Sequence, residues 1–292
     1  LSHSHIRIGS FQRLLYLDQH DNIRKLLDHA IRTYMPALWR DETAERALAF
    51  LEEICRRVAV TGASWMLAGF VHGVLNTDNI NITGESFDYG PWRFLPVLDP
   101  TFTAAYFDET GLYAYGRQPD TLLWNLTRLA ECMLPLAEKS KLEDVLRGFE
   151  PQFQRAFNAA MLRRLGLAPA GDEAGTALAR SVWKFLIDTK IPFEQFFFDW
   201  FGGRASEKRA AASPSAGLYA AENFEPVFAT IAAHATAPGI RLEHAYFSRE
   251  KPCTMLIDEV EALWAPIAES DDWSAFHEKL ADIALMREAY AA

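Results

Sequence analysis

One span of the sequence, HGVLNTDNINITGESFDYGP (residues 72–91), concentrates side chains that could bind a metal ion or accept a proton. Its six carboxylate or carboxamide residues are Asn76, Asp78, Asn79, Asn81, Glu85 and Asp88. Oxygen ligands suit Mg²⁺, which binds one or two protein side chains together with phosphate oxygens and water. The same residue types also favour polar turns, because Asn and Asp side chains hydrogen-bond to nearby backbone groups. Composition leaves both interpretations open.

The spacing within this span is that of a kinase-like catalytic loop. Such loops have the form H-R-D-x-x-x-x-N, in which the Asp accepts a proton and the Asn binds metal, and a D-F-G-like turn supplies a second metal ligand. His72 and Asn79 have the matching separation, and Asp88 opens a D-Y-G triplet beyond them. Val74 stands where a kinase has its catalytic Asp, so Asp78 is the nearest carboxylate that could accept a proton. The spacing allows Asn79 and Asp88 to bind one ion, and it leaves a polar turn capped by Asn and Asp side chains equally open.

Helices are predicted on both sides of this span. Apolar residues recur at helical spacing in residues 20–35, 41–60 and 121–139, and Pro36 ends the first of these patterns. Gly62 lies in the apolar continuation of the second pattern, so that helix either ends near residue 61 or uses the glycine for a close contact. Within the span, INI and FDYG flank TGES, which predicts two short strands joined by a tight turn.

The composition narrows the class of protein. Half of the 292 residues are hydrophobic and the formal net charge is −10, which predicts a folded core and argues against a basic nucleic-acid-binding face. No segment approaches the ~18 uncharged apolar residues of a membrane span. The three cysteines have no paired spacing, as is usual for reduced cytosolic proteins. We expect a cytoplasmic protein without nucleic-acid or membrane partners.

The chain is predicted to be mainly α-helical, in three parts. Residues 203–217, GRASEKRAAASPSAG, contain few apolar residues, which predicts a flexible loop or linker over residues 203–219. A helical domain would precede it at residues 1–202, and a C-terminal helical extension would follow at residues 220–292.

The span 72–91 resembles the signature of the selenoprotein O (YdiU) family of kinase-fold pseudokinases, which reads H-G-V-x-N-T-D-N and then D-Y-G-P. The similarity continues through SHSHIRIGSFQRL upstream and through LDPTF, GLYAYGRQP and LLWNLTRLAECMLPL downstream, roughly the first 165 residues in all. The resemblance implies a protein-kinase-like C-terminal lobe with a short β-hairpin at the catalytic loop. It also implies that the family's N-terminal lobe, with its glycine-rich loop and nucleotide-binding Lys, is absent from these residues.

The resemblance further implies AMP transfer from Mg-ATP to Ser, Thr or Tyr hydroxyls of proteins, with Mn²⁺ as an alternative ion. By motif, Asp78 matches the family's proton acceptor and Asn79 and Asp88 match its magnesium ligands, so that Asp88 also contacts the nucleotide through the ion. Arg7, in SHIRIG, matches an arginine that holds the γ-phosphate. A guanidinium suits that role because it binds phosphate oxygens bidentately.

The sequence departs from the family pattern at several positions. A second phosphate-binding Arg would fall one residue before Leu1, and Ala104 stands where many members have a regulatory Cys. With the N-terminal lobe absent, the 292-residue chain is expected to fold but to be inactive or weak. Two alternatives to AMP transfer stay open, namely a small-molecule kinase-like phosphotransferase and a non-catalytic pseudokinase binding module.

Overall fold

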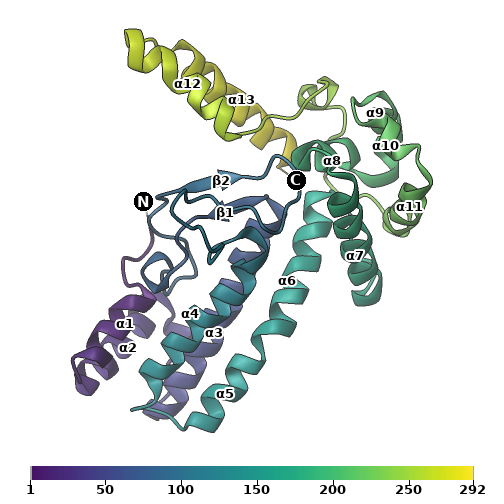
Figure 1. Cartoon of the computed structure of the whole chain (residues 1–292). Coiled ribbons are helices and arrows are strands. Elements are labelled where there is room, and N and C mark those ends of the chain that lie inside the picture. The colour runs from purple at the N-terminus through teal and green to yellow at the C-terminus, as the bar shows by residue number, and fades with distance from the viewer. Residues whose placement is uncertain (1, 292) are drawn as a thin grey trace. The chain divides into compact units, whose positions relative to one another are not determined.

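The computed structural model describes residues 2–291, which are mainly helical with one two-stranded sheet (Figure 1). The chain divides into two compact units. The first consists of Leu1–Met66, Val71–Trp92 and Pro100–Ala156, and the second of Leu67–Phe70, Arg93–Asp99 and Phe157–Ala292. The predicted boundaries at residues 202 and 219 both lie within the second unit. The kinase-like character of the helical part stays a prediction.

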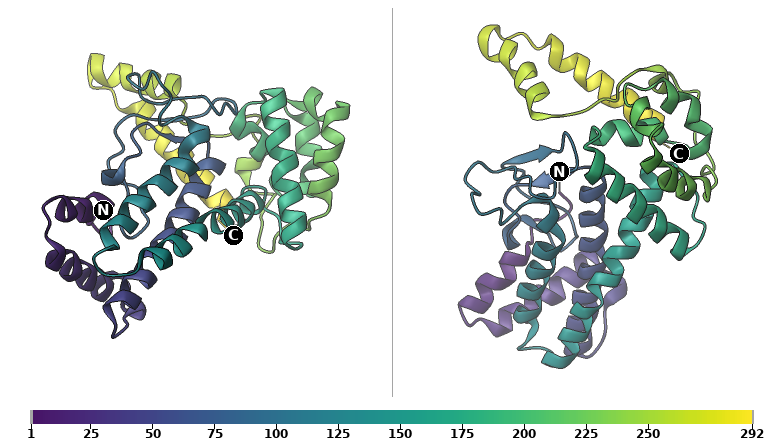
Figure 2. Two further views of the ribbon diagram at one scale, coloured as in Figure 1. Left: turned by 60° about the horizontal axis from the view of Figure 1, so that its bottom comes forward. Right: turned by 45° about the vertical axis from the view of Figure 1, so that its right-hand side comes forward.

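The first unit is built on four amphipathic helices, which Figure 2 shows from two further directions. They are α1 (Ile8–Tyr16), α2 (His20–Tyr34), α3 (Thr43–Leu67) and α4 (Gln118–Met133), followed by α5 (Lys139–Arg147) and the start of α6 (Phe149–Arg164). Their predicted apolar faces form one buried cluster, and α1 packs against both α2 and α4. Short 3₁₀ turns are η1 (Pro36–Leu38), η2 (Thr77–Asn79) and η3 (Tyr115–Arg117).

Helix α3 continues through Gly62 because the glycine makes a close helix contact. A Cβ atom at this position would lie 2.4 Å from Leu122 Cδ1 and 3.2 Å from Phe153 Cε2. Glycine normally weakens a helix interior by about 1 kcal/mol, but here it lets α3 approach the side chains of α4 and α6. Of the two predicted outcomes, the close contact is therefore the observed one.

The sheet does not lie where the sequence predicted a hairpin. It pairs β1 (Phe70–His72) with β2 (Trp92–Phe94) in antiparallel fashion, on either side of the catalytic loop. Inside the loop, where strands were expected, only the isolated bridge Ile80↔Ser86 joins the two arms. The turn itself forms, because Gly84 donates to the Asn81 carbonyl at 2.9 Å, but it is too short to carry a continuous ladder.

The second unit has an aromatic core. It contains α7 (Asp172–Thr189), α8 (Phe193–Trp200) and α11 (Glu225–Ala232), with α7 packed against α11. The phenylalanines of α8 are all buried, as expected for core residues rather than a ligand-binding box. The remaining elements are η4 (Gly203–Ser206), α9 (Glu207–Ala212), α10 (Ala216–Tyr219), η5 (Glu222–Phe224), η6 (Ala245–Ser248), α12 (Ile257–Ser270) and α13 (Ser274–Tyr290).

Residues 203–219, expected to form a flexible loop or linker, contain η4, α9 and α10. A buried carboxylate attaches this segment to α8, because Asp199 is 1% exposed and accepts hydrogen bonds from Ser213 Oγ at 2.5 Å and Tyr219 Oη at 2.7 Å. The same carboxylate accepts a third bond from Gln195 Nε2 at 2.8 Å. Buried polar contacts of this kind anchor the segment without a run of apolar residues.

Replacing Asp199 by alanine should destabilise the second unit by about 3 kcal/mol, because it leaves buried donors unpaired at about 1–3 kcal/mol each. Asp199→Asn should cost less, since its amide oxygen still accepts from the hydroxyl groups. Urea unfolding followed by circular dichroism measures both losses. Glu243→Ala, at an exposed residue, is the control and should stay within ~0.5 kcal/mol of wild type. Equal stability of Asp199→Ala and the control would show that the network does not anchor the segment.

The three cysteines, Cys55, Cys132 and Cys253, are free and buried. Burial raises the pKa of each thiol to about 12, so all three stay protonated and unreactive near neutral pH. No helix among the described residues is both long and apolar enough to cross a membrane.

Candidate active site

The loop of residues 72–91 is closed at its base by the sheet, and Asn76 caps the 3₁₀ turn η2 within it. Gly73 donates to the Pro91 carbonyl at 2.7 Å, next to the paired ends of β1 and β2. Asn76 caps η2, and its side chain accepts from the Asp78 backbone N–H at 2.9 Å. This turn directs consecutive side chains differently, because Asn79 is 4% exposed whereas the Asp78 side chain is 57% exposed. Asp78 is therefore accessible to a substrate, and Asn79 faces inward.

The two predicted metal ligands lie on paired backbone segments. Phe87 donates its N–H to the Asn79 carbonyl at 2.9 Å, which places Asp88 one residue beyond the pairing. Asn79 Nδ2 donates to the Val74 carbonyl, so Oδ1 is the atom left to bind a cation. Asp88 is exposed and has a left-handed backbone with φ of 53°, a conformation that Asp and Asn tolerate better than most residues.

This donor set fits Mg²⁺ bound together with a nucleotide. Among the described residues, no group of three or more His, Cys, Asp or Glu side chains could hold a metal ion. A site dependent on protein ligands alone, such as a structural zinc site, would need more donors. Magnesium typically takes one or two side-chain oxygens and completes its shell with phosphate and water, which Asn79 and Asp88 permit.

Arg7 and Gly9, from the start of α1, lie beside Asp78. Arg7 Nη1 is 3.6 Å from Asp78 Oδ1, and its guanidinium lies 5.2 Å from the centre of the Phe87 ring. Both partners of the ion pair are partly exposed, so the pair contributes little free energy and an incoming phosphate can replace the carboxylate. A Cβ atom on Gly9 would lie 2.2 Å from Asp78 Oδ1. Only glycine leaves room for the carboxylate in this position.

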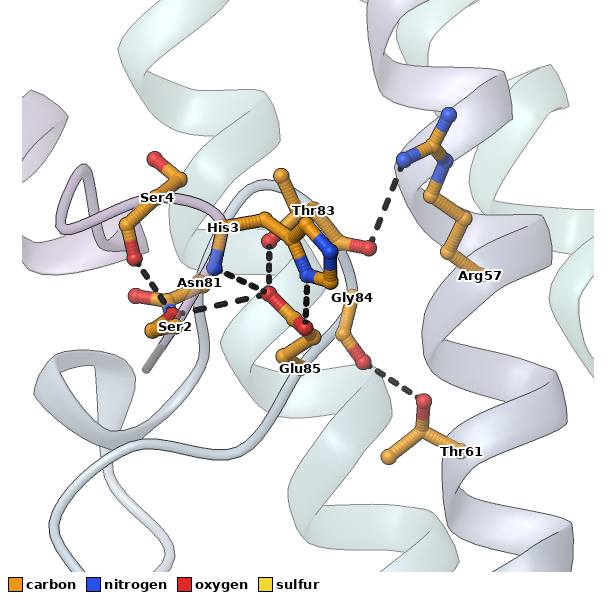
Figure 3. A network of polar contacts seen from close by, with 9 residues as sticks. All are labelled: Ser2, His3, Ser4, Arg57, Thr61, Asn81, Thr83, Gly84 and Glu85. Atoms are coloured by element: carbon orange, nitrogen blue, oxygen red, sulfur yellow. Dashed lines mark hydrogen bonds and ion pairs between the residues drawn. The ribbon is translucent and has the colours of Figure 1, made fainter. Parts of the chain in front are cut away.

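The N-terminal segment is held against the loop of residues 72–91 by a hydrogen-bond network, here called the polar clasp (Figure 3). It consists of Ser2, His3, Asn81, Thr83 and Glu85. His3 Nδ1 lies 2.6 Å from Glu85 Oε1, and Thr83 Oγ1 donates to Glu85 Oε2 at 2.9 Å. Burial alone would raise the pKa of Glu85, but the hydrogen bonds from His3 and Thr83 lower it. Asn81 Nδ2 donates to Ser2 Oγ at 2.8 Å. Backbone pairing then continues to the bridge Arg7↔Asn81, so the clasp fixes the register that places Arg7 beside the loop.

His72 organises the loop from the buried side. The residue is 1% exposed, and its backbone N–H donates to Gln118 Oε1 at 2.9 Å. Nδ1 accepts from the Val74 N–H at 3.3 Å, which leaves Nε2 to donate to the Phe87 carbonyl at 3.4 Å. Burial lowers the pKa of His72, although the Phe87 carbonyl and the Asp88 carboxylate oppose that shift. A neutral imidazole therefore joins the start of the loop to the D-Y-G turn.

The six oxygen-bearing residues of the span divide into two groups. Asn76, Asn81 and Glu85 serve the turn and the clasp, whereas Asp78, Asn79 and Asp88 remain as candidates for chemistry, with Asp78 and Asp88 exposed and Asn79 buried. The roles of Gly9 and Gln12 were not predicted from the sequence. Gln12 accepts a hydrogen bond from Thr77 Oγ1 and so holds η2 against α1. A sequence motif that combined SHIRIGSFQ with the loop of residues 72–91 is the signal that could have indicated both roles.

A hollow of about 870 Å³ opens beside Asp78. Arg7, Gly9 and Thr77 line it at the loop, and Arg13, Tyr16 and Leu17 line it farther along α1. The exposed carboxylate thus faces a space that can admit part of a substrate.

Comparison with known proteins shows which family the chain belongs to. The family model for protein adenylyltransferase SelO matches residues 1–284. Protein nucleotidyltransferase YdiU of Trichormus variabilis is 33% identical over 294 residues, which cover 97% of this chain and 60% of that protein. The protein of the same name from Gloeobacter violaceus is 36% identical over 304 residues, or 99% of this chain and 60% of that protein. The chain thus spans about 60% of the length of these relatives.

Proposed function

The chain belongs to the protein adenylyltransferase SelO family, and we propose that it carries the catalytic loop of an enzyme that transfers AMP from ATP to protein hydroxyl groups. One observation carries the proposal. The exposed Asp78 carboxylate, the Arg7 guanidinium 3.6 Å away and the paired segments bearing Asn79 and Asp88 all belong to one loop and the helix beside it. These are a base, a cation for phosphate and two oxygen ligands for a metal.

Each group has a role in the proposed reaction. The hydroxyl oxygen of the acceptor protein bonds to the α-phosphorus, the bond from that phosphorus to the β-bridging oxygen breaks, and pyrophosphate leaves. Asp78 takes the hydroxyl proton, which Val74 cannot do from the usual kinase position. Arg7 exchanges its contact with Asp78 for phosphate oxygens, which frees the carboxylate to act as a base.

Asn79 and Asp88 would hold Mg²⁺, or Mn²⁺ in its place. The ion, when bound, would neutralise charge that develops on the phosphate oxygens. The clasp and His72 keep these groups in register, because they fix both ends of the backbone that carries them.

Labelled ATP tests the proposal against its closest rival. Acceptor protein should gain label from ATP labelled at the α-phosphate and none from ATP labelled at the γ-phosphate. Transfer from the γ-position instead would identify a kinase-like phosphotransferase. Nucleotide binding without transfer of either label would identify a binding module. The assay uses the 292-residue chain and a hybrid in which residues 1–292 replace the matching segment of the Gloeobacter violaceus relative.

Gly9→Ala should lower AMP transfer by about 10- to 100-fold, because a misplacement of ~1 Å in a catalytic group can cost that much. The added methyl group would displace the Asp78 carboxylate, which lies 2.2 Å from the Cβ position. Stability should not fall, since alanine favours a helix over glycine. Initial rates of the hybrid and its variant, with thermal unfolding alongside, measure both effects.

Gly217→Ala is the matched control. Gly217 also lies in a helix, α10, but no atom lies within 4 Å of the position that its Cβ would take. A wild-type rate for Gly9→Ala, with the control also unchanged, would mean that Gly9 does not position Asp78.

A further inference from the structure

A separate cavity of about 520 Å³ lies within the second unit, and no residue of the catalytic loop lines it. Its wall is largely apolar and includes Leu95, Phe193, Met255, Ile283 and Met286. Cavities of roughly 300–1,000 Å³ with apolar walls and a few polar groups are typical of small-molecule sites. The proposed AMP transfer gives this cavity no role.

The charged groups at this cavity are predominantly positive. Arg163 and Arg287 line it, both are exposed, and neither side chain has a partner among residues 2–291. Arg164 also lines it but is already neutralised, because its Nη2 lies 2.7 Å from Glu194 Oε2. The cavity therefore carries two uncompensated guanidinium groups in a protein whose formal net charge is −10. Such a local excess of positive charge attracts an anion.

Tyr290 adds an unused donor to the same cavity. Its hydroxyl oxygen is buried and has no hydrogen-bond partner in the described structure. Burial raises the pKa of this hydroxyl, so it stays protonated and able to donate. An unpaired buried hydroxyl costs free energy, so this donor is one that the protein's own hydrogen bonds leave unused among the described residues.

We propose that this cavity binds an amphipathic carboxylate, with its apolar chain among Ile283, Met286 and Phe193 and its head group held by Arg163 and Arg287. A neutral apolar molecule would match the wall and leave both guanidinium groups unused. A small inorganic anion would match the arginines and leave the apolar wall unfilled. Only a ligand with an apolar chain and an anionic head group both fills the apolar wall and pairs with the two arginines.

Calorimetric titration of the 292-residue chain with decanoate and with 1-decanol tests the proposal, independently of any transferase activity. Decanoate should bind saturably at one site. The double variant Arg163→Glu and Arg287→Glu should weaken decanoate binding by about tenfold or more while leaving decanol binding unchanged, because only the carboxylate meets the reversed charge. Arg180→Glu, at an exposed arginine of α7 away from the lining, is the matched control and should bind decanoate as wild type does.

Ile283→Trp fills the cavity and should weaken both ligands, with circular dichroism showing that the variant is folded. Three results would overturn the proposal. They are no saturable decanoate binding to the wild-type chain, equal decanoate binding in the charge-reversed variant, and unchanged binding of both ligands in folded Ile283→Trp. Parallel behaviour of decanoate and decanol in every variant would likewise reject the anionic head group.

Discussion

Asp78→Asn is expected to lower AMP transfer by about 10²–10⁴-fold, the usual contribution of a general base. The amide keeps the size of the carboxylate and a hydrogen-bond acceptor, but it cannot take the proton of the acceptor hydroxyl. Nucleotide affinity should change far less, because Asp78 contacts Arg7 rather than either proposed metal ligand. Initial rates and nucleotide titrations of the hybrid with the Gloeobacter violaceus relative measure the two effects separately.

Asp21→Asn provides the matched control for this result. Asp21 is an exposed carboxylate in the first turn of α2 and lines no part of the hollow beside Asp78. Its variant should transfer AMP at the wild-type rate. A wild-type rate in Asp78→Asn as well would remove Asp78 from the chemistry and require another base.

Asp88→Asn is expected to lower transfer at least ~100-fold at low Mg²⁺ concentration, because a metal ion supplies several kcal/mol of charge stabilisation. The substitution removes a charge that would bind the ion. It preserves the backbone, since asparagine adopts the left-handed conformation of Asp88, with φ of 53°, about as readily as aspartate. The lost activity should be partly recovered at higher Mg²⁺ or with Mn²⁺. Rates measured across a magnesium titration test this directly.

Asp271→Asn is the control for the backbone. Asp271 also has a left-handed conformation, with φ of 54°, and asparagine can still accept its bond from Trp273 Nε1. This variant should keep the wild-type magnesium dependence. An unchanged magnesium dependence in Asp88→Asn would show that Asp88 does not hold the ion.

The helices could be predicted from the sequence where burial follows one face. Ile23, Leu27 and Ile31 of α2 recur at helical spacing and are all buried. The sheet could not be located in this way. FVH and WRF are three residues each, too short for an alternating pattern, whereas the β-branched INI segment is stabilised by the N-terminal segment through Ile6 and Ile8. Which segment pairs with which depends on contacts distant in sequence.

The short helices within residues 203–219 could not be predicted from the sequence for a similar reason. The alanines around α9 give no strong apolar pattern, and one of the contacts that attach the segment is a buried carboxylate, Asp199. The contribution of Asp199 to stability depends on its burial and on hydrogen-bond partners up to 20 residues away in the sequence. Helix propensity, which is summed over a short stretch of sequence, takes account of neither burial nor distant partners.

The candidate site residues and the residues that support them differ in how far the sequence indicates them. Asp78, Asn79 and Asp88 are indicated by residue types, spacing and the family resemblance, and their chemical roles stay predictions. Gly9 is different, since its role is to leave space for a carboxylate 69 residues away, and only the fold brings the two together. The ion pair of His3 with Glu85 likewise joins residues that no local pattern connects.

The central claim is that Arg7, Asp78, Asn79 and Asp88 form one site for a metal-bound nucleotide. A crystal structure of the hybrid with Mn²⁺ and a non-hydrolysable ATP analogue, with anomalous scattering used to locate manganese, tests it most directly. The ion should lie between Asn79 Oδ1 and the Asp88 carboxylate, and the Arg7 guanidinium should have left Asp78 for a phosphate oxygen. Manganese bound elsewhere, or a nucleotide that contacts neither Arg7 nor the ion, would contradict the account.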